Sequence, residues 1–180
     1  MRPILFLAAL APACAETTVT DDSFAADALT LWSDAFADGD ALPDDLRCER
    51  DGGDGASPPL AWSDPAEVAV SFALTMTVAE ADNHYWLLWD IPAGTRSLSR
   101  GNAESVGTEG SNKDEVDTGY TPPCAPPDSA GTHTYTITLM ALDGDPVDLP
   151  DTDDVSVDLD VLTAAVDGLV AERATISFTN

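Results

Sequence analysis

Positive charge is scarce in this chain of 180 residues. Lysine and arginine together number 7 against 33 aspartate and glutamate residues, which gives a formal net charge of −26, and Lys113 is the only lysine. A surface this negative repels the phosphate backbone of nucleic acids and anionic lipid leaflets, so neither is expected as a direct partner. Such a strongly hydrated acidic surface fits a high-salt or extracellular setting, because salt screens the repulsion among the acidic groups.

Long hydrophobic runs are also lacking. The longest apolar stretch covers residues 4–13 and is too short to cross a bilayer. Because it follows Arg2 and ends in small residues, it predicts a secretory signal. We therefore expect a signal peptide or lipoprotein leader over residues 1–15, an acidic tether over 16–27 and one domain over 28–180. The protein would then be exported, as a periplasmic or cell-surface lipoprotein or as a secreted protein.

The chain has only three cysteines, and their parity is informative. Cys48 and Cys124 lie in the body of the chain and would pair in an oxidising compartment, which leaves Cys14 over. Two fates of Cys14 remain open. An A-x-A motif allows cleavage before Glu16, which would discard Cys14, whereas residues 10–14 resemble a lipoprotein box that would place a lipid on it. The acidic tether that follows favours the anchor slightly.

Histidine is equally rare, and the motifs of common enzymes are missing. His84 and His133 are the only histidines, and no nucleophile elbow, zinc-protease, phosphate-loop or dinucleotide-binding motif is present. Two histidines and two paired cysteines cannot build a typical zinc site, and the Asp-rich stretch 151–154 lacks EF-hand spacing. The sequence therefore predicts no metal, no cofactor and no enzymatic activity. A hydrolase that uses His133 with Glu80 or Asp82 is a weaker alternative, because no activated nucleophile accompanies them.

The chain does contain a series of short strand patterns. Alternating or continuous apolar residues predict strands over residues 28–36, 68–78, 85–89, 134–142 and 174–178. We expect the second of these to be half-buried and the third to be covered on both faces. Helical spacing of apolar residues predicts one helix over 158–172, and the segments 93–129 and 143–158 are predicted loops. Many short strands with one late helix indicate a mainly antiparallel β domain.

Several short blocks can be recognised along this pattern. They are 36–43 (FADGDALP), Cys48, 57–62 (SPPLAW), 86–92 (WLLWDIP), 119–120 (GY), 123–127 (PCAPP), 131–135 (GTHTY) and 139–143 (LMALD). In this order they resemble the phosphatidylethanolamine-binding proteins, in particular the bacterial branch called Raf-kinase-inhibitor-like. The resemblance covers about residues 29–178. Cys48 and Cys124 fall where bacterial relatives carry cysteines, which supports their pairing.

The resemblance implies a Greek-key antiparallel β-sandwich with one C-terminal helix and a small anion-accepting pocket at one end. In this family the pocket combines a D-P-D loop, a histidine before the aromatic residue of a central strand, a Pro-Pro segment and an H-R-Y motif. Matched residue by residue, Pro126, Pro127, His133 and Tyr135 belong to this pocket. Trp86 matches the aromatic position on the strand.

This sequence also departs from the family's pattern at the pocket. Residues 80–82 read Glu-Ala-Asp in place of D-P-D, and Thr134 replaces the arginine of H-R-Y. The pocket histidine aligns with Tyr85. His84 stands one position earlier and should point to the other face of the strand. Two groups expected to orient an anion are therefore altered.

We predict a non-enzymatic exported protein with a small pocket for an anionic or zwitterionic head group, phosphate-like or phosphoethanolamine-like. The candidate ligand-binding residues are Glu80, Asp82, Tyr85, Trp86, Tyr120, Pro126, Pro127, His133 and Tyr135. His133 and the tyrosine hydroxyls would donate hydrogen bonds to an anion, and an acidic residue would meet an ammonium group.

Two alternatives stay open at this point. The aromatic residues could simply belong to the core, above all Trp86, and the two prolines could only stiffen a loop. The protein could also be a surface lipoprotein that binds or inhibits another exported protein through residues 93–129, with the membrane reached only through a lipid on Cys14.

Overall fold

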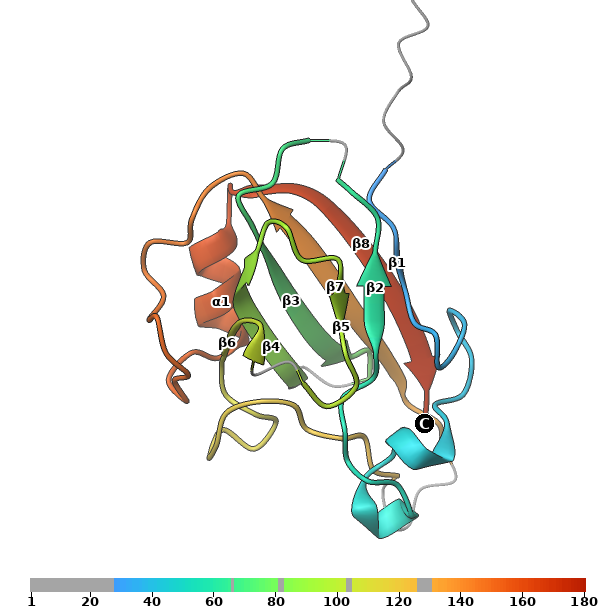
Figure 1. Ribbon diagram of the computed structural model, residues 1–180. Coiled ribbons are helices and arrows are strands. Elements are labelled where there is room, and N and C mark those ends of the chain that lie inside the picture. The colour runs from blue at the N-terminus through green and yellow to red at the C-terminus, as the bar shows by residue number, and fades with distance from the viewer. Residues whose placement is uncertain (1–27, 66, 81–82, 103–104, 126–130) are drawn as a thin grey trace, which may run out of the picture.

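The computed structural model folds into two antiparallel β-sheets and one α-helix (Figure 1). It describes residues 28–65, 67–80, 83–102, 105–125 and 131–180. The mainly β fold class predicted from the sequence is confirmed. Outside the described residues lie the predicted leader and tether at 1–27, which include Cys14, and also Asp82, Pro126 and Pro127. Among the described residues no helix is long and apolar enough to cross a membrane.

The larger sheet has five strands and the smaller sheet has three. The larger is built from β3 (Ser71–Val78), β4 (Asn83–Pro92), β6 (Thr108–Glu109), β7 (Thr134–Leu142) and β8 (Val170–Thr179). Its spatial order is β6-β4-β3-β7-β8. The smaller is built from β1 (Leu31–Trp32), β2 (Leu60–Trp62) and β5 (Ser97–Leu98), in the order β1-β2-β5. Two short 3-10 helices, Asp44–Leu46 and Glu49–Asp51, precede β2.

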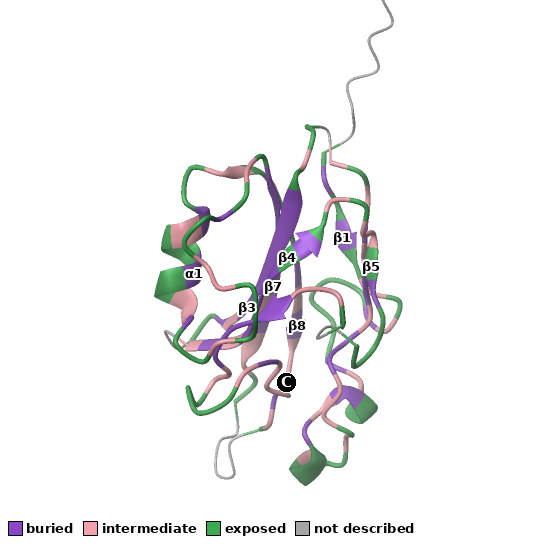
Figure 2. Cartoon of the chain, turned by 60° about the vertical axis from the view of Figure 1, so that its left-hand side comes forward, coloured by how far each residue is buried: buried purple, intermediate pink, exposed green. Residues whose placement is uncertain are grey.

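Apolar side chains cover both faces of the larger sheet. One cluster, which includes Trp62, Leu74 and Ile137, fills the space between the two sheets. A second cluster, which includes Leu87 and Trp89, packs between the other face and the helix α1 (Leu159–Val166). The central strands are buried along most of their length in Figure 2.

This double cover corrects one expectation for β3. The alternating sequence predicted a half-buried strand, but both faces are buried because α1 and its cluster cover the side that carries Ala73. The strand also begins later than predicted. Val68 and Val70 precede it and are 86% and 44% exposed. The expectation that the neighbouring strand β4 is covered on both faces is confirmed, and this strand is longer at both ends than the predicted 85–89.

The predicted helix is shorter than its apolar spacing suggested. Asp158 caps its first turn by accepting a hydrogen bond of 2.9 Å from the backbone N–H of Val161. It ends at Val166 because Gly168 turns the chain in the left-handed region, at φ +80°, and leads it directly into β8. The final strand is correspondingly longer than predicted and starts at Val170.

Two predicted segments contain different secondary structure. The first strand is only two residues long, since 28–36 pairs with β2 only through Leu31 and Trp32. The predicted loop 93–129 contains β5 and β6, which pair with β2 and β4. Pairs this short carry no periodicity that a sequence pattern can reveal.

A disulfide joins Cys48, which lies between the two 3-10 helices, to Cys124, with a Cα–Cα distance of 5.3 Å. The pairing expected from the sequence is thus formed. It links residues 76 positions apart, and the backbone N–H of Cys48 also donates to the carbonyl of Pro123 over 3.1 Å. The bridge therefore ties the loop before β2 to the loop before β7.

Removing this bridge should destabilise the fold without changing its topology. Substitution of both cysteines by alanine frees a long loop in the unfolded chain, so the free energy of unfolding should fall by about 4–5 kcal/mol at most. Urea denaturation followed by tryptophan fluorescence measures the change. The wild-type protein in a strong reductant should show the same shift. An unchanged denaturation midpoint would contradict a stabilising role.

Candidate ligand-binding site

A β-bulge in β4 determines which side chains reach the site. In the pairing of β3 with β4, Met76 lies opposite Trp86 and Thr77 lies opposite His84, so Tyr85 has no partner. Tyr85 and Trp86 consequently both pack against the cluster between the sheets, although they are adjacent in sequence. Strict alternation would have placed them on opposite faces.

His84 lies on the other side of the sheet, as its position in the sequence suggested. It is buried, its Nε2 lies 2.9 Å from the Ser111 hydroxyl oxygen, and it borders a small hollow with Asp158 and Leu159 at the start of α1. His84 is therefore separate from the candidate site.

All three tyrosines of the chain gather where β4 and β7 begin. The rings of Tyr85 and Tyr135 meet edge to face, with centroids 5.0 Å apart. Tyr135 also stacks on Phe178, and Tyr120 meets Trp86 edge to face at 5.4 Å. Residues that lie 35 positions apart in sequence, 85 and 120, are thus brought to one end of the sheet by the loop that follows β6.

Two of these hydroxyls are held in their neutral form. Burial raises the pKa of Tyr135 above its ordinary value, and a hydrogen bond with Tyr85 adds to the effect. Burial likewise raises the pKa of Tyr120, with a smaller contribution from the neighbouring Tyr135. The Tyr120 hydroxyl oxygen is buried and has no hydrogen-bond partner among the described residues. A neutral phenol is a good hydrogen-bond donor and a poor nucleophile.

Glu80 and His133 form an acid–histidine pair at this end of the sheet. Because Val78 pairs with Tyr135 across β3 and β7, residues just beyond these strand ends are also neighbours. The Nδ1 of His133 lies 3.7 Å from a carboxylate oxygen of Glu80, and both side chains are partly exposed. The same carboxylate accepts hydrogen bonds of 3.1 and 3.2 Å from the backbone N–H of Thr134. Glu80 is therefore fixed against the start of β7.

Lys113 is a member of the site that sequence reasoning missed. Its ammonium nitrogen lies 5.9 Å from the centre of the Tyr85 ring, within reach of a cation–π interaction. Its backbone N–H donates to the Thr121 hydroxyl, and the backbone N–H of Thr121 donates to the carbonyl of Tyr85 over 2.7 Å. The only signal in the sequence was that Lys113 is the single lysine of a very acidic chain.

Trp86 is better described as a core residue than as a ligand contact. Its side chain is fully buried, and its indole N–H donates a hydrogen bond of 2.9 Å to the carboxylate of Glu109. The position matches the family pattern, but the geometry favours the alternative that Trp86 belongs to the core.

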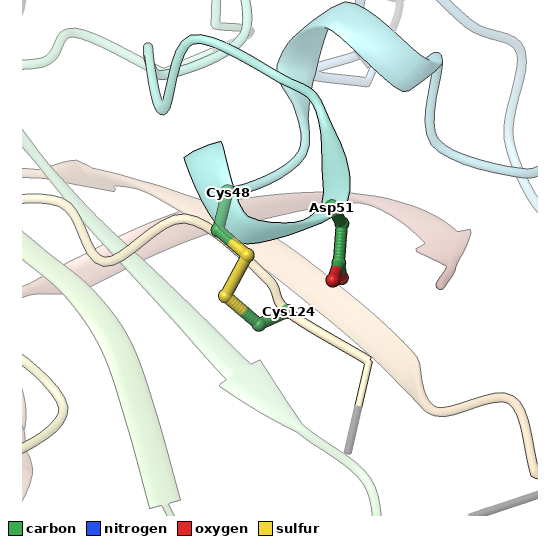
Figure 3. A group of neighbouring side chains, drawn as sticks. All are labelled: Cys48, Asp51 and Cys124. Atoms are coloured by element: carbon green, nitrogen blue, oxygen red, sulfur yellow. A yellow bond between two sulfur atoms is a disulfide. The ribbon is translucent and has the colours of Figure 1, made fainter. Parts of the chain in front are cut away.

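Two residues that follow Cys48 fix the backbone of Ala125, which lies just before Pro126 and Pro127. Asp51 accepts a hydrogen bond of 2.7 Å from the backbone N–H of Ala125, which holds the pKa of Asp51 below its ordinary value. The Arg50 guanidinium donates to the carbonyl of Ala125. Figure 3 shows Asp51 beside Cys48 and Cys124. This cluster has the spacing of a metal site, but two disulfide-bonded sulfur atoms are not available as thiolate ligands.

The structure therefore brings five predicted residues into one neighbourhood. They are Glu80, Tyr85, Tyr120, His133 and Tyr135. Together with Lys113 they offer neutral hydroxyl donors, an ammonium group, an imidazole and one carboxylate. Such a set can hold an anion, and the carboxylate can meet a cation attached to it.

Comparison with known proteins identifies the family. A family model described as phosphatidylethanolamine-binding protein matches residues 32–179. The chain belongs to the phosphatidylethanolamine-binding protein family. The name of this family refers to binding and not to catalysis.

Curated relatives of the chain come from several organisms. The "Putative lipoprotein LppC" of Mycobacterium tuberculosis is 34% identical over 73% of this chain, and the match spans 64% of that protein. The UPF0098 protein YbhB of Escherichia coli is 32% identical over 67% of this chain and 82% of its own length. The chain thus spans less than two thirds of its mycobacterial relatives, with 55% for the UPF0098 protein of Mycobacterium bovis.

Solved structures agree with this assignment. The crystal structure of a "Putative PhosphatidylEthanolamine-Binding Protein (PEBP) Homolog" from Chlamydia trachomatis has a TM-score of 0.72 and 27% identity, and covers 85% of this chain and 97% of that one. Escherichia coli YbcL has the same TM-score of 0.72 at 20% identity, over 85% of this chain and 98% of its own, which supports the fold alone.

The tyrosine cluster predicts an unusual alkaline titration. The raised pKa values keep Tyr120 and Tyr135 protonated above pH 10.0, the ordinary tyrosine value, while an unfolded chain ionises there. Their contribution to stability is therefore complete below about pH 10 and lost as pH rises through the folded pKa values. Absorbance of phenolate should show fewer than three equivalents in the folded protein near pH 11.

The same titration in urea provides the reference, since all three phenols should then ionise together. The variant Tyr120→Phe should remove one late-titrating group. Circular dichroism on the same samples shows where unfolding begins. Three phenols that ionise near pH 10 in a folded sample would contradict the burial of the cluster.

Proposed function

We propose that this protein is a non-enzymatic binding protein that holds a small anionic or zwitterionic head group, phosphate-like or phosphoethanolamine-like, at the tyrosine cluster. The observation that supports this most directly is the convergence of all three tyrosines with His133 and the only lysine. Although the chain has a net charge of −26, its only lysine, Lys113, lies beside the ring of Tyr85.

The local chemistry favours binding over catalysis. The pKa values of Tyr120 and Tyr135 are raised, which makes their hydroxyls donors and weakens them as nucleophiles. His133 and Glu80 could act as an acid–base pair, but the geometry gives them no activated hydroxyl or thiol among the described neighbours. The hydrolase alternative therefore has no support beyond the pair itself.

A zwitterionic ligand fits the charge balance better than a simple anion. The overall field of the protein repels anions, and an attached ammonium group reduces this repulsion during approach. Glu80 is fixed by Thr134 and lies within the same neighbourhood as the donors, so it can contact the positive end of the ligand. The phosphate-like end would then face Lys113, His133 and the tyrosine hydroxyls.

The segment 93–129 supports the alternative interaction role less well. It contributes β5 and β6 to the two sheets, and Leu98, Thr108 and Ser111 within it are buried. The segment therefore takes part in both sheets, and it contributes Lys113 and Tyr120 to the candidate site.

Titration with phosphate, acetate and phosphoethanolamine tests this function directly. NMR or calorimetry should show saturable binding, tightest for phosphoethanolamine because it carries both charges. The variants Tyr85→Phe and Tyr135→Phe each remove one hydroxyl, and Lys113→Gln removes the ammonium group. Each should weaken binding by roughly tenfold, the value of one hydrogen bond to a charged group.

The matched control is Arg173→Gln, which removes a positive charge from an exposed position on β8 away from the cluster. It should leave the affinity unchanged apart from a small general salt effect. No saturable response to any of the three ligands would overturn the proposed function. Equal losses in Lys113→Gln and Arg173→Gln would show that only the net charge matters.

We also propose that the protein is exported and anchored through a lipid on Cys14. The expectation rests on the apolar leader and the cysteine left over after the Cys48–Cys124 bridge. The name of the mycobacterial relative, a lipoprotein, concerns that protein but is consistent with this proposal.

Intact mass of the protein isolated from its native envelope should show a mature chain that begins at Cys14 with two or three acyl chains attached. Treatment with a reductant should add the mass of two hydrogens for the single bridge. The substitution Cys14→Ser, which leaves the bridge intact, should release the protein from the membrane fraction. A mature chain that begins at Glu16 would refute the anchor and support simple secretion.

A further inference from the structure

Trp32 is exposed on the smaller sheet. The residue is 43% exposed, whereas the other three tryptophans of the chain, Trp62, Trp86 and Trp89, are at most 2% exposed. Figure 2 shows β1 and β5 in the layer on the side away from α1. An indole has one of the largest apolar surfaces of any side chain, so a ligand that covers it gains free energy. Trp32 therefore marks a candidate contact for a ligand.

Strand pairing places Trp32 in one row with Ala61 and Ser97. Trp32 lies opposite Ala61 in the pairing of β1 with β2, and Ala61 lies opposite Ser97 in the pairing of β2 with β5. Residues that are directly opposite each other share one face of a sheet. The adjacent residues Leu31 and Leu98 belong to the cluster between the two sheets. The row of Trp32, Ala61 and Ser97 therefore faces outward.

A hollow of about 220 Å³ adjoins this row, and residues 34, 59–61 and 97–99 line it. The hydroxyl of Ser33 donates to the carbonyl of Pro59 over 2.7 Å and accepts from the backbone N–H of Ala35 over 3.1 Å. These two bonds tie the turn that carries Asp34 to the segment before β2, so this wall is preformed. The volume is below the roughly 300–1,000 Å³ of pockets for drug-sized ligands, which suits a single small ring.

The polar side chains of the hollow are available to a ligand. The carboxylate of Asp34 and the hydroxyls of Ser97 and Ser99 form no side-chain hydrogen bond or ion pair with any other described residue. All three residues are exposed. A carboxylate accepts hydrogen bonds, and each hydroxyl can both donate and accept. The hollow thus offers donors and acceptors beside the large apolar surface of Trp32.

We propose that this hollow binds the pyranose ring of a sugar, either as a free monosaccharide or as the end of a glycan. A pyranose with equatorial hydroxyls has an apolar face of C–H groups, which would lie against the indole of Trp32. Its hydroxyls would donate to the carboxylate of Asp34 and exchange hydrogen bonds with Ser97 and Ser99.

The charge of the chain favours a neutral ligand at this position. The net charge of −26 and the carboxylate of Asp34 repel an anion. A simple cation would find a carboxylate at any of the 33 acidic residues, so charge alone does not select this hollow. An exposed indole next to hydroxyls without partners does select a neutral polyol. None of the lining residues belongs to the tyrosine cluster, so this inference is independent of the proposed head-group site.

Methyl β-glucoside and cellotriose are suitable probes for the single ring and for the end of a glycan. Because the other three tryptophans are buried, acrylamide quenching of tryptophan fluorescence reports mainly on Trp32. Both sugars should reduce the quenching saturably, and tighter binding of cellotriose would identify a glycan end as the preferred form. The variant Asp34→Ala should weaken binding by roughly tenfold, since it removes an acceptor that carries a charge.

The matched control is Asp148→Ala, which removes an exposed carboxylate outside the hollow and should bind as the wild type. Calorimetry tests Trp32→Ala, which removes the fluorescent reporter. This variant should lose sugar binding while it keeps the urea denaturation midpoint and the response to phosphoethanolamine at the tyrosine cluster. Val147→Ala, a truncation at another exposed apolar residue, should keep sugar binding.

Four outcomes would overturn the proposal. The first is that neither sugar changes the quenching saturably, and the second is that Asp34→Ala and Asp148→Ala bind equally well. The third is that choline saturates the same signal at a lower concentration than the sugars, which would indicate a cation site. The fourth is that the quenching falls with protein concentration alone, which would show that a second copy of the chain covers Trp32.

Discussion

The pairing of β3 with β4 on one side and β7 on the other is the constraint on which the site depends. Val78 of β3 pairs with Tyr135 of β7 at one end of this three-strand unit. Glu80 and His133, which lie just beyond these paired residues, are therefore neighbours. On the β4 side, the bulge at Tyr85 places its ring on the same face of the sheet as the ring of Tyr135. A slip of one residue in either pairing would send these side chains to opposite faces and disperse the site.

Sequence patterns predicted the elements that bury continuous or alternating apolar residues and missed those that do not. β4 was predictable from its continuous apolar run and β7 from its alternating apolar residues, and the late helix because Leu162 and Val166 face the second cluster. β5 and β6 were missed because pairs of two residues have no period. The half-buried expectation for β3 failed because no local pattern shows that α1 covers the second face.

The candidate site was predictable only where motifs mark it. His133 and Tyr135 carry a motif, and the family resemblance placed Glu80 and Tyr85 beside them. Lys113 has no motif and enters through the loop geometry after β6, so only the fold could reveal it. Trp86 shows the converse case, since its motif position is right but its indole is bonded to Glu109 in the interior.

The acidity of the chain is compatible with a candidate site built mainly from neutral donors. In so acidic a chain an exposed lysine readily pairs with a carboxylate, as Lys113 does with Asp114 over 3.1 Å, whereas a buried phenol keeps its proton and can donate without contributing charge. Burial that raises the pKa of Tyr120 and Tyr135 therefore stabilises the fold in the same neutral state that the proposed binding role requires. The single lysine then needs to supply only one positive charge, placed against the ring of Tyr85, and the fold around it can remain strongly acidic.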